Sequence, residues 1–174
     1  MHAYTEHYTV EDFNRWEGDW ELIDGMPYAM TPSPSFAHQR VAGKLFRQFD
    51  EQLDDCPVCF AVMEMDWEIM GDTVVRPDVL VVCHEPEDRI VRTPEVVVEV
   101  VSPSTTKRDE VLKFEHYERE GVLFYLLVYP EKKIAKLYRN QNGRFVKVGD
   151  YATETADLPL DRCPLTLDFS KVWP

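Results

Sequence analysis

The sequence feature that most restricts the fold is a run of valines broken by one acidic residue. Glu99 lies within residues 96–101, and all the remaining residues of this segment are valine. A β-branched run of this length is typical of a strand buried on both faces of a sheet. A second such run, residues 79–82, begins directly after Asp78. A carboxylate at such a position loses hydration and needs a partner, a proton or a metal ion. The two acids therefore predict a metal site at the ends of two buried strands.

Length and composition indicate a globular domain. The 174 residues can bury a substantial core, and we expect one domain spanning residues 1–174. No apolar run approaches the ~20 residues that a membrane span requires, so no membrane partner is expected. Residues 1–12 carry Glu6, Glu11 and Asp12 without an apolar segment, unlike a secretory signal. We therefore expect the protein in the cytoplasm.

The charge distribution argues against a general nucleic-acid coat protein. The formal net charge is −13, whereas binding along a phosphate backbone depends on clustered Lys and Arg. Residues 132–147 are the exception, because they contain six basic residues and no acid. This stretch predicts either a local basic surface or an ordinary solvated hairpin.

The four cysteines give a weak signal. Cys56 and Cys59 have the spacing of a metal or redox pair, but Cys83 and Cys163 form no second pair of this kind. A redox-active pair of the thioredoxin type opens a helix after a strand, whereas Cys56 and Cys59 lie between a helical pattern and a strand. We therefore expect ordinary reduced cysteines.

Periodicity and turn signals predict alternating helices and strands. Thr9 and Asp12 form a capping box for a short helix, and Asp24-Gly25 predicts a hairpin. Ser35 can cap a long helix with an apolar stripe. A further helix is expected from about residue 107 to 120, with Gly121 ending it. The expected strands are residues 20–23, 26–30, 58–63, 67–70, 79–82, 96–101, 123–129, 134–139 and 145–148, and residues 159–174 look irregular. This order favours an α/β sandwich with a mixed sheet.

Several of these segments together resemble the bacterial Uma-type endonucleases of the PD-(D/E)xK superfamily. The resemblance covers roughly residues 9–130. It implies a restriction-endonuclease-like sandwich, in which helices flank a mixed central β-sheet and an N-terminal β-hairpin extends it. The segments that carry it are Trp20-Glu21-Leu22-Ile23-Asp24-Gly25, Ser33-Pro34 with His38-Gln39, Arg76-Pro77-Asp78-Val79, Val98-Glu99-Val100-Val101-Ser102-Pro103-Ser104-Thr105, and Asp109 with Lys113 and Tyr117.

The sequence departs from the superfamily pattern at one catalytic position. In that pattern a lysine lies two residues after the acid on the same strand, but here Val101 follows Glu99 at that distance. Lys113, in the next helix, is the best replacement. Asp109 and Tyr117 lie one turn on either side of Lys113 and share its helix face.

The resemblance implies a metal-dependent endonuclease acting on nucleic acid, with DNA as the expected substrate. Asp78, Glu99 and the carbonyl of Val100 would hold Mg²⁺ or Mn²⁺, and Lys113 would orient water or stabilise the transition state. Glu21 is expected to be an additional catalytic acid. The expected substrate-binding residues are His38, Gln39, Ser102 and Tyr117, although Ser102 can equally cap the following helix.

Other interpretations of the same residues remain open. Glu21 can be an exposed position of an alternating hairpin, His38 a satisfied core histidine, and Lys113 a solvated cation. The altered lysine position and the acidic net charge are also compatible with a non-catalytic module that keeps the nuclease fold for binding.

The resemblance further implies a homodimer, because one site cuts one strand per binding event. Trp16, Trp67, Phe124, Tyr125 and Trp173 lie on elements that one small core need not bury completely. Exposed aromatic residues are enriched at protein contacts. A monomer with a well-filled core is the alternative.

Overall fold

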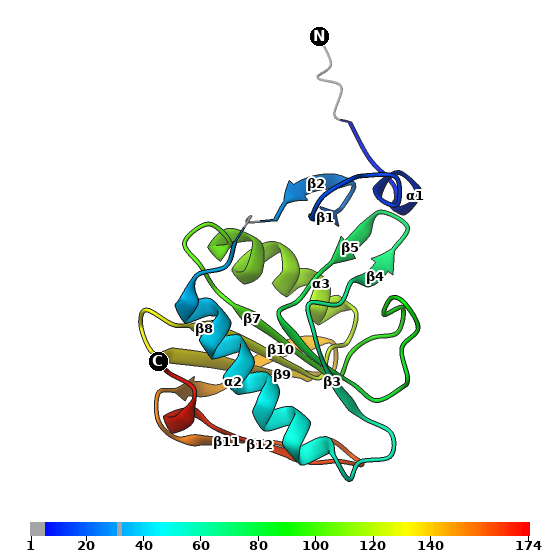
Figure 1. Cartoon of the computed structure of the whole chain (residues 1–174). Helices are drawn as coiled ribbons and strands as arrows, with labels where there is room; N and C mark the ends of the chain where they lie inside the picture. The colour runs from blue at the N-terminus through cyan, green and yellow to red at the C-terminus, as the bar shows by residue number, and fades with distance from the viewer. Residues whose placement is uncertain (1–5, 31–32) are drawn as a thin grey trace.

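The central element is a six-stranded mixed sheet (Figure 1). The computed structural model describes residues 6–30 and 33–174, so residues 1–5 of the N-terminal stretch considered above lie outside the described range. In spatial order the strands are β10 (Arg144–Tyr151), β9 (Ile134–Gln141), β8 (Phe124–Tyr129), β7 (Val96–Val100), β6 (Val79–Val82) and β3 (Phe60–Met63).

The valine-rich strand β7 lies inside this sheet and is fully buried, as its composition predicts. It pairs antiparallel with β6 and parallel with β8. A parallel pair needs a crossover connection, which here contains a π-helix (Arg108–Leu112) continuing into helix α3 (Lys113–Arg119). Gly121, with φ of 82°, follows the helix end that the sequence predicts.

The two faces of the sheet are covered by different elements. Alternate β7 residues, Val96, Val98 and Val100, join a core cluster with helix α2 (Phe36–Leu53). Val97 and Val101 belong to a second cluster on the opposite face, which includes Tyr117 of α3. Because side chains alternate along a strand, Glu99 belongs to the α3 face. This alternation determines which residues can contact Glu99.

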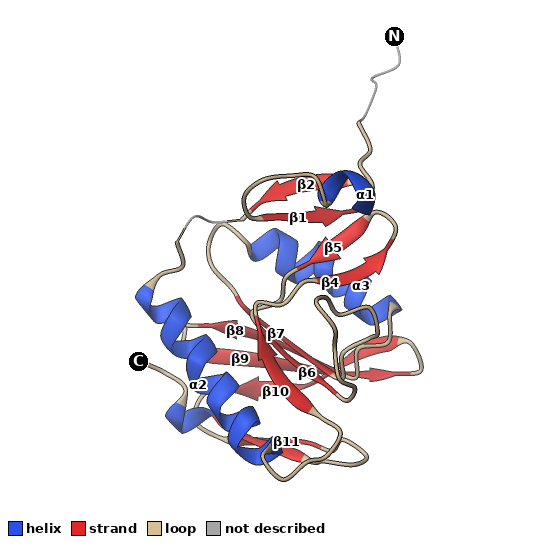
Figure 2. Ribbon diagram, turned by 45° about the vertical axis from the view of Figure 1, so that its right-hand side comes forward, coloured by secondary structure: helices blue, strands red, loops and turns tan. Residues whose placement is uncertain are grey.

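The predicted N-terminal hairpin is part of a second sheet. The hairpin strands are β1 (Trp20–Ile23) and β2 (Met26–Ala29), and β1 also pairs with β5 (Thr73–Val75). β4 (Trp67–Met70) completes the order β2-β1-β5-β4. Helix α1 (Val10–Phe13) has the predicted Thr9–Asp12 capping box. In Figure 2 this sheet lies above the six-stranded sheet. The hairpin is therefore held against the core at the height of α3.

An aromatic layer separates α3 from the sheet. The rings of Trp67 and Tyr117 stack with centroids 5.5 Å apart, and Tyr117 meets Tyr125 edge-on at 5.0 Å. Phe114 contacts Tyr125 and Phe145 in the same layer. Pairs of this kind are stabilising beyond the apolar area that they bury. The layer fixes the position of α3 above β7 and β8.

Four expectations from the sequence are wrong in detail. The C-terminal segment is not wholly irregular, since β12 (Leu165–Asp168) pairs with β11 (Thr155–Leu158) and a short 3-10 helix follows (Phe169–Lys171). Strand β5 was not expected. Trp67, Phe124 and Tyr125 are at most 1% exposed, so they offer no contact surface for a second subunit.

The cysteines are the fourth correction, because they form two disulfides. Cys56 bonds to Cys163 and Cys59 bonds to Cys83. The pairing follows from the fold: Phe60 and Val82 are register partners, so Cys59 and Cys83 face each other one position beyond them. Cys163 lies in the β11–β12 connection. Among the described residues, no helix is both long and apolar enough to cross a membrane.

Candidate active site

Glu99 is a buried carboxylate that faces α3. It is 3% exposed, and its Oε1 atom accepts hydrogen bonds from Lys113 Nζ at 3.0 Å and from Tyr117 Oη at 2.8 Å. Both donors bind the same oxygen, so Oε2 accepts no hydrogen bond from the part of the chain that the structure describes. A lysine at position 101 would reach the same face of the strand. Lys113 therefore brings an ammonium group from the helix to the face of β7 on which residue 101 also lies.

Lys113 is surrounded by three carboxylates. Its Nζ atom lies 2.7 Å from Glu21 Oε1 and 3.6 Å from Asp109 Oδ1, in addition to its contact with Glu99. Lys113 is itself only 3% exposed. Burial alone would lower the pKa of Lys113, but the three carboxylates raise it above its ordinary value. The side chain is therefore a buried ammonium whose charged form the carboxylates favour, and not a solvated surface cation.

Glu21 connects the second sheet to this cluster. It is 1% exposed and accepts hydrogen bonds from the Arg76 backbone N–H at 2.9 Å and from Arg108 Nη1 at 2.9 Å. Burial raises the pKa of Glu21, but Lys113 and these donors outweigh burial and lower it. The interpretation of Glu21 as an exposed hairpin position is wrong.

Asp78 lies directly before β6, and its two oxygens have different partners. Oδ2 accepts a hydrogen bond from the Val100 backbone N–H at 2.7 Å, which fixes Asp78 against the end of β7. Oδ1 lies 3.2 Å from His38 Nε2 of helix α2. Burial lowers the pKa of His38, but the contact with Asp78 raises it overall. His38 Nδ1 is buried without a hydrogen-bond partner among the described residues. His38 is therefore not a fully satisfied core histidine.

The π-helix turns a fourth carboxylate toward the cluster. Asp109 is 2% exposed, and its backbone carbonyl accepts a hydrogen bond from Tyr125 Oη at 2.8 Å. Burial raises the pKa of Asp109, with Lys113 opposing it. π-Helical turns are rare in proteins, and those that do occur are often found at functional sites.

These groups surround a cavity of about 340 Å³. Six carboxylates and three cations line it, so the wall has a formal excess of three negative charges. Burial, together with the charges of Asp109, Asp78 and Glu21, raises the pKa of Glu99 well above its ordinary value. The carboxylates are Glu21, Glu64, Asp78, Glu99, Asp109 and Glu131, and the cations are Arg76, Arg108 and Lys113.

The residues present fit a hard divalent cation. Carboxylate oxygens are the donors that Mg²⁺ and Mn²⁺ prefer. Glu99 Oε2 has a free acceptor position, and the surplus of negative charge disfavours the cavity without a counterion. Asp78, Glu99 and the carbonyl of Val100 are the candidate ligands, since all three line the cavity.

Only some of the expected substrate-binding residues line the cavity. His38 and Ser102 line the cavity, and Tyr117 reaches it through Glu99. Gln39 is exposed and does not line the cavity. The backbone carbonyl of Ser102 accepts a hydrogen bond from Thr106 Oγ1 at 2.9 Å, so Ser102 also supports the start of the next helix.

Arg108 is the residue that the sequence does not reveal. It bonds to Glu21, which is 87 residues away, and its guanidinium lies 4.9 Å from the centroid of the Tyr28 ring. From the sequence, Asp109 is identified only as a residue on the same helix face as Lys113. Local spacing gives no signal for Arg108, because its partners come from the other sheet.

Comparison with known proteins identifies the family and the fold. Residues 10–170 match the Uma2 family, described as "putative restriction endonuclease". An uncharacterised protein of Synechocystis sp. (strain PCC 6803) is 31% identical over 160 residues, covering 85% of this chain and 83% of its own. A crystal structure from Anabaena variabilis, titled as a "putative nuclease belonging to DUF820", superposes with a TM-score of 0.77 at 17% identity. It covers 95% of this chain and 97% of its own, and it confirms the fold. With nearly its whole length matched, the chain belongs to the Uma2 family of restriction-endonuclease-like proteins.

Proposed function

We propose that this protein is a metal-dependent endonuclease that hydrolyses phosphodiester bonds of nucleic acid, with DNA as the favoured substrate. One observation carries the proposal: acids from two strand ends and a helix lysine converge on one cavity, with Lys113 Nζ 3.0 Å from Glu99 Oε1. Membership of the Uma2 family supports the reaction class. The whole chain acts as one nuclease-fold domain in this proposal, and the cytoplasm, where nucleic acid lies, is the proposed compartment.

The acidic wall supports dependence on Mg²⁺ or Mn²⁺. Carboxylates outnumber cations along the cavity wall, so a phosphodiester is repelled unless a bound cation offsets their charge. Asp78, Glu99 and the Val100 carbonyl would hold the ion, with Glu21 as the additional acid. A bound divalent ion supplies acidification of water and charge neutralisation at the phosphate.

Lys113 acts by its charge in this proposal. Its raised pKa keeps it protonated at neutral pH, so it is unsuited to accept a proton as a general base. A fixed ammonium can stabilise negative charge that develops on the phosphate in the transition state. Glu21 and Asp109 hold the ammonium in position, and Tyr117 orients the Glu99 carboxylate that faces it.

Substrate contacts come from the open side of the site. His38 lines both the main cavity and an adjacent hollow of about 290 Å³ that also contains Ser102 and Lys132. The raised pKa of His38 favours the charged imidazolium, which can bind a phosphate oxygen. Gln39 is left without a proposed contact.

The basic stretch 132–147 contributes less than its composition suggests. Arg144 pairs with Glu118 and Lys147 pairs with Asp150, so two of its charges are locally neutralised. The stretch forms the β9–β10 hairpin, and Lys132 is the member that reaches the hollow beside the site.

A nuclease assay tests the proposed function directly. Purified protein with Mn²⁺ is expected to cut supercoiled or linear DNA, and a chelator should abolish cutting. Single-stranded DNA and RNA of equal length, incubated in parallel, decide the substrate class. Binding of the same substrates without cleavage, under all metal conditions, would instead support the non-catalytic binding module. The assay should use the Lys107→Met variant as a matched control, because Lys107 is an exposed cation beside the same helix.

We also propose a homodimer, because two sites are needed to cut both strands of a duplex in one binding event. Phe36 supports a second contact, since it is 76% exposed at the start of α2, next to the residues that line the cavity. Light scattering at micromolar concentration is expected to give twice the 20.4 kDa chain mass. Phe36→Ser should shift the mass toward the monomer, whereas a mass near one chain for the wild type at low and moderate salt would contradict the dimer.

A further inference from the structure

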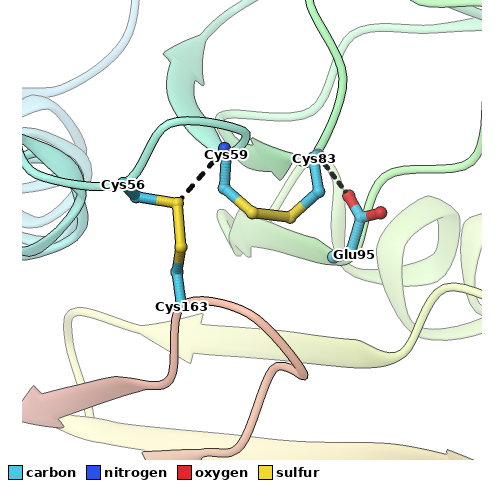
Figure 3. Close-up of a disulfide and its surroundings, with 5 residues drawn as sticks. All are labelled: Cys56, Cys59, Cys83, Glu95 and Cys163. Atoms are coloured by element: carbon cyan, nitrogen blue, oxygen red, sulfur yellow. Dashed lines mark hydrogen bonds between the residues drawn. A yellow bond between two sulfur atoms is a disulfide. The ribbon is translucent and has the colours of Figure 1, made fainter.

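All four cysteines meet at one place, which Figure 3 shows together with Glu95. Cys56 follows the end of α2, Cys59 precedes β3, Cys83 follows β6, and Cys163 lies between β11 and β12. Asp78 precedes β6 and Cys83 follows it, which separates the two groups by roughly 17 Å of extended chain. The cysteine cluster is therefore a separate feature of the fold.

The sulfur atoms are already close to the spacing of a metal site. One ligand atom each of Cys56, Cys59 and Cys163 lies within 4.8 Å of the others, and Cys83 Sγ is bonded to Cys59 Sγ at 2.05 Å. Four thiolates about 2.3 Å from a tetrahedral Zn²⁺ lie roughly 3.8 Å apart. Once the disulfides are reduced, Cys56, Cys59 and Cys163 would need only small shifts to reach that spacing, and Cys83 Sγ, released from Cys59, would have to turn toward them to complete the set.

The local backbone also favours thiolate ligands. The Cys59 backbone N–H donates a hydrogen bond to Cys56 Sγ at 3.3 Å, which stabilises negative charge on that sulfur. Pro57 lies inside this Cys-x-x-Cys turn, and the spacing is the one that zinc sites use most. Cys56, Cys83 and Cys163 are partly exposed, so an ion can enter. The nearby Glu95 carboxylate accepts a hydrogen bond from the Cys83 backbone N–H at 2.7 Å.

We propose that the reduced protein binds one Zn²⁺ through Cys56, Cys59, Cys83 and Cys163, and that the two disulfides are the oxidised state of this site. A dithiol reductant converts each disulfide to two thiols by exchange and is itself oxidised to a disulfide, with two electrons and two protons transferred per bond. Zinc then binds the four thiolates, and their protons leave to solvent. Soft sulfur donors select Zn²⁺, whereas the oxygen donors at Asp78 and Glu99 select Mg²⁺ or Mn²⁺.

The role of this ion is structural. One disulfide joins the end of α2 to the β11–β12 hairpin and the other joins β3 to β6, and a four-thiolate ion would hold all of these elements at one point. In a reducing compartment disulfides are rare, whereas a Cys-x-x-Cys pair is more often a metal ligand. The proposed site therefore preserves in reduced protein the connection that the disulfides make in oxidised protein.

Thiol alkylation of the wild-type chain tests the proposal. Protein reduced with a dithiol and separated from it without oxygen should expose four thiols to a maleimide. One equivalent of Zn²⁺ should reduce the number labelled within the same time from four to about zero, as counted by mass spectrometry. Co²⁺ in place of Zn²⁺ should give thiolate charge-transfer and tetrahedral d–d absorption bands, and both should be weakened by Cys163→Ser.

The Asp78→Ala/Glu99→Ala variant is the matched control, because it alters only the carboxylate site and should keep the cobalt–thiolate spectrum. Circular dichroism follows folding throughout. If reduced protein unfolds, zinc should restore the spectrum. Labelling of four thiols that is unchanged by zinc, in folded protein or in protein that zinc does not refold, would overturn the proposal.

Discussion

Replacing Lys113 is expected to reduce the rate of nucleic-acid cleavage by about 10²–10³-fold, the usual effect of losing one group that stabilises transition-state charge. Lys113→Arg is the more informative variant, because it keeps a positive charge among Glu21, Glu99 and Asp109. The planar guanidinium cannot take the place of a compact ammonium, so activity should stay low. Single-turnover cleavage with Mn²⁺ is the measurement.

Folding and metal binding must be measured for the same variants. Lys113→Met removes the cation shared by three buried carboxylates, of which Glu21 alone keeps a second one, Arg108, and such a loss typically costs about 3–5 kcal/mol. Lys113→Arg should remain folded and still respond to metal. Lys107→Met, on an exposed neighbour, should cleave like the wild type. Wild-type rates in folded Lys113→Arg and Lys113→Met would contradict the catalytic role of the lysine.

Addition of Mn²⁺ or Mg²⁺ is expected to raise the melting temperature of the wild type, because the ion binds only the folded site. At a concentration 100-fold above its Kd the gain is about 2.7 kcal/mol, or roughly 5–11 °C for a chain of this size. Asp78→Ala with Glu99→Ala should abolish the shift. Differential scanning fluorimetry with and without a chelator measures it.

A second prediction concerns how the stability of the metal-free protein depends on pH, and the Asp78→Ala/Glu99→Ala variant tests it. The raised pKa of Glu99 means that the folded state disfavours its charge, so wild-type stability should fall as pH rises from about 4.5 through the raised value. The variant should lose this contribution and melt at an equal or higher temperature at neutral pH. Glu51→Ala with Asp54→Ala removes two exposed acids and should keep the full metal shift. A full shift in Asp78→Ala/Glu99→Ala would exclude these residues as ligands.

Much of the fold could be predicted because its signals are local. The valine run of β7, the Ser35 cap of α2 and the Asp24-Gly25 turn each depend on neighbouring residues. The β11–β12 hairpin was missed because its strands are four residues long and lie among prolines, which favour an irregular interpretation. The disulfide of Cys56 and Cys163 spans 107 residues, a separation at which spacing has no predictive value.

The candidate site also contains residues that local sequence patterns predict and residues that only the fold brings together. Because Glu99 lies inside a buried valine strand, the sequence predicts that it has a charged or hydrogen-bonding partner. The shared helix face of Asp109, Lys113 and Tyr117 indicates where that partner lies. Glu21 and Arg108 come together only because the second sheet packs beside α3. The π-helical turn that carries Asp109 also has no sequence signature, since the same residues would suit an ordinary α-helix.

The aromatic layer beneath α3 has a consequence for how such an enzyme can be tuned. A lysine on the metal-binding strand would have its reach fixed by the backbone of that strand. Here the distance between Lys113 and Glu99 depends on how α3 is packed, because its Tyr117 ring contacts both Tyr125 of β8 and Trp67 of β4. Exchanging one ring for a smaller or larger side chain would lower, raise or tilt the helix. Under the proposed function, the cleavage rate is thereby exposed to selection at the buried aromatic positions Trp67 and Tyr125, whose rings pack against Tyr117.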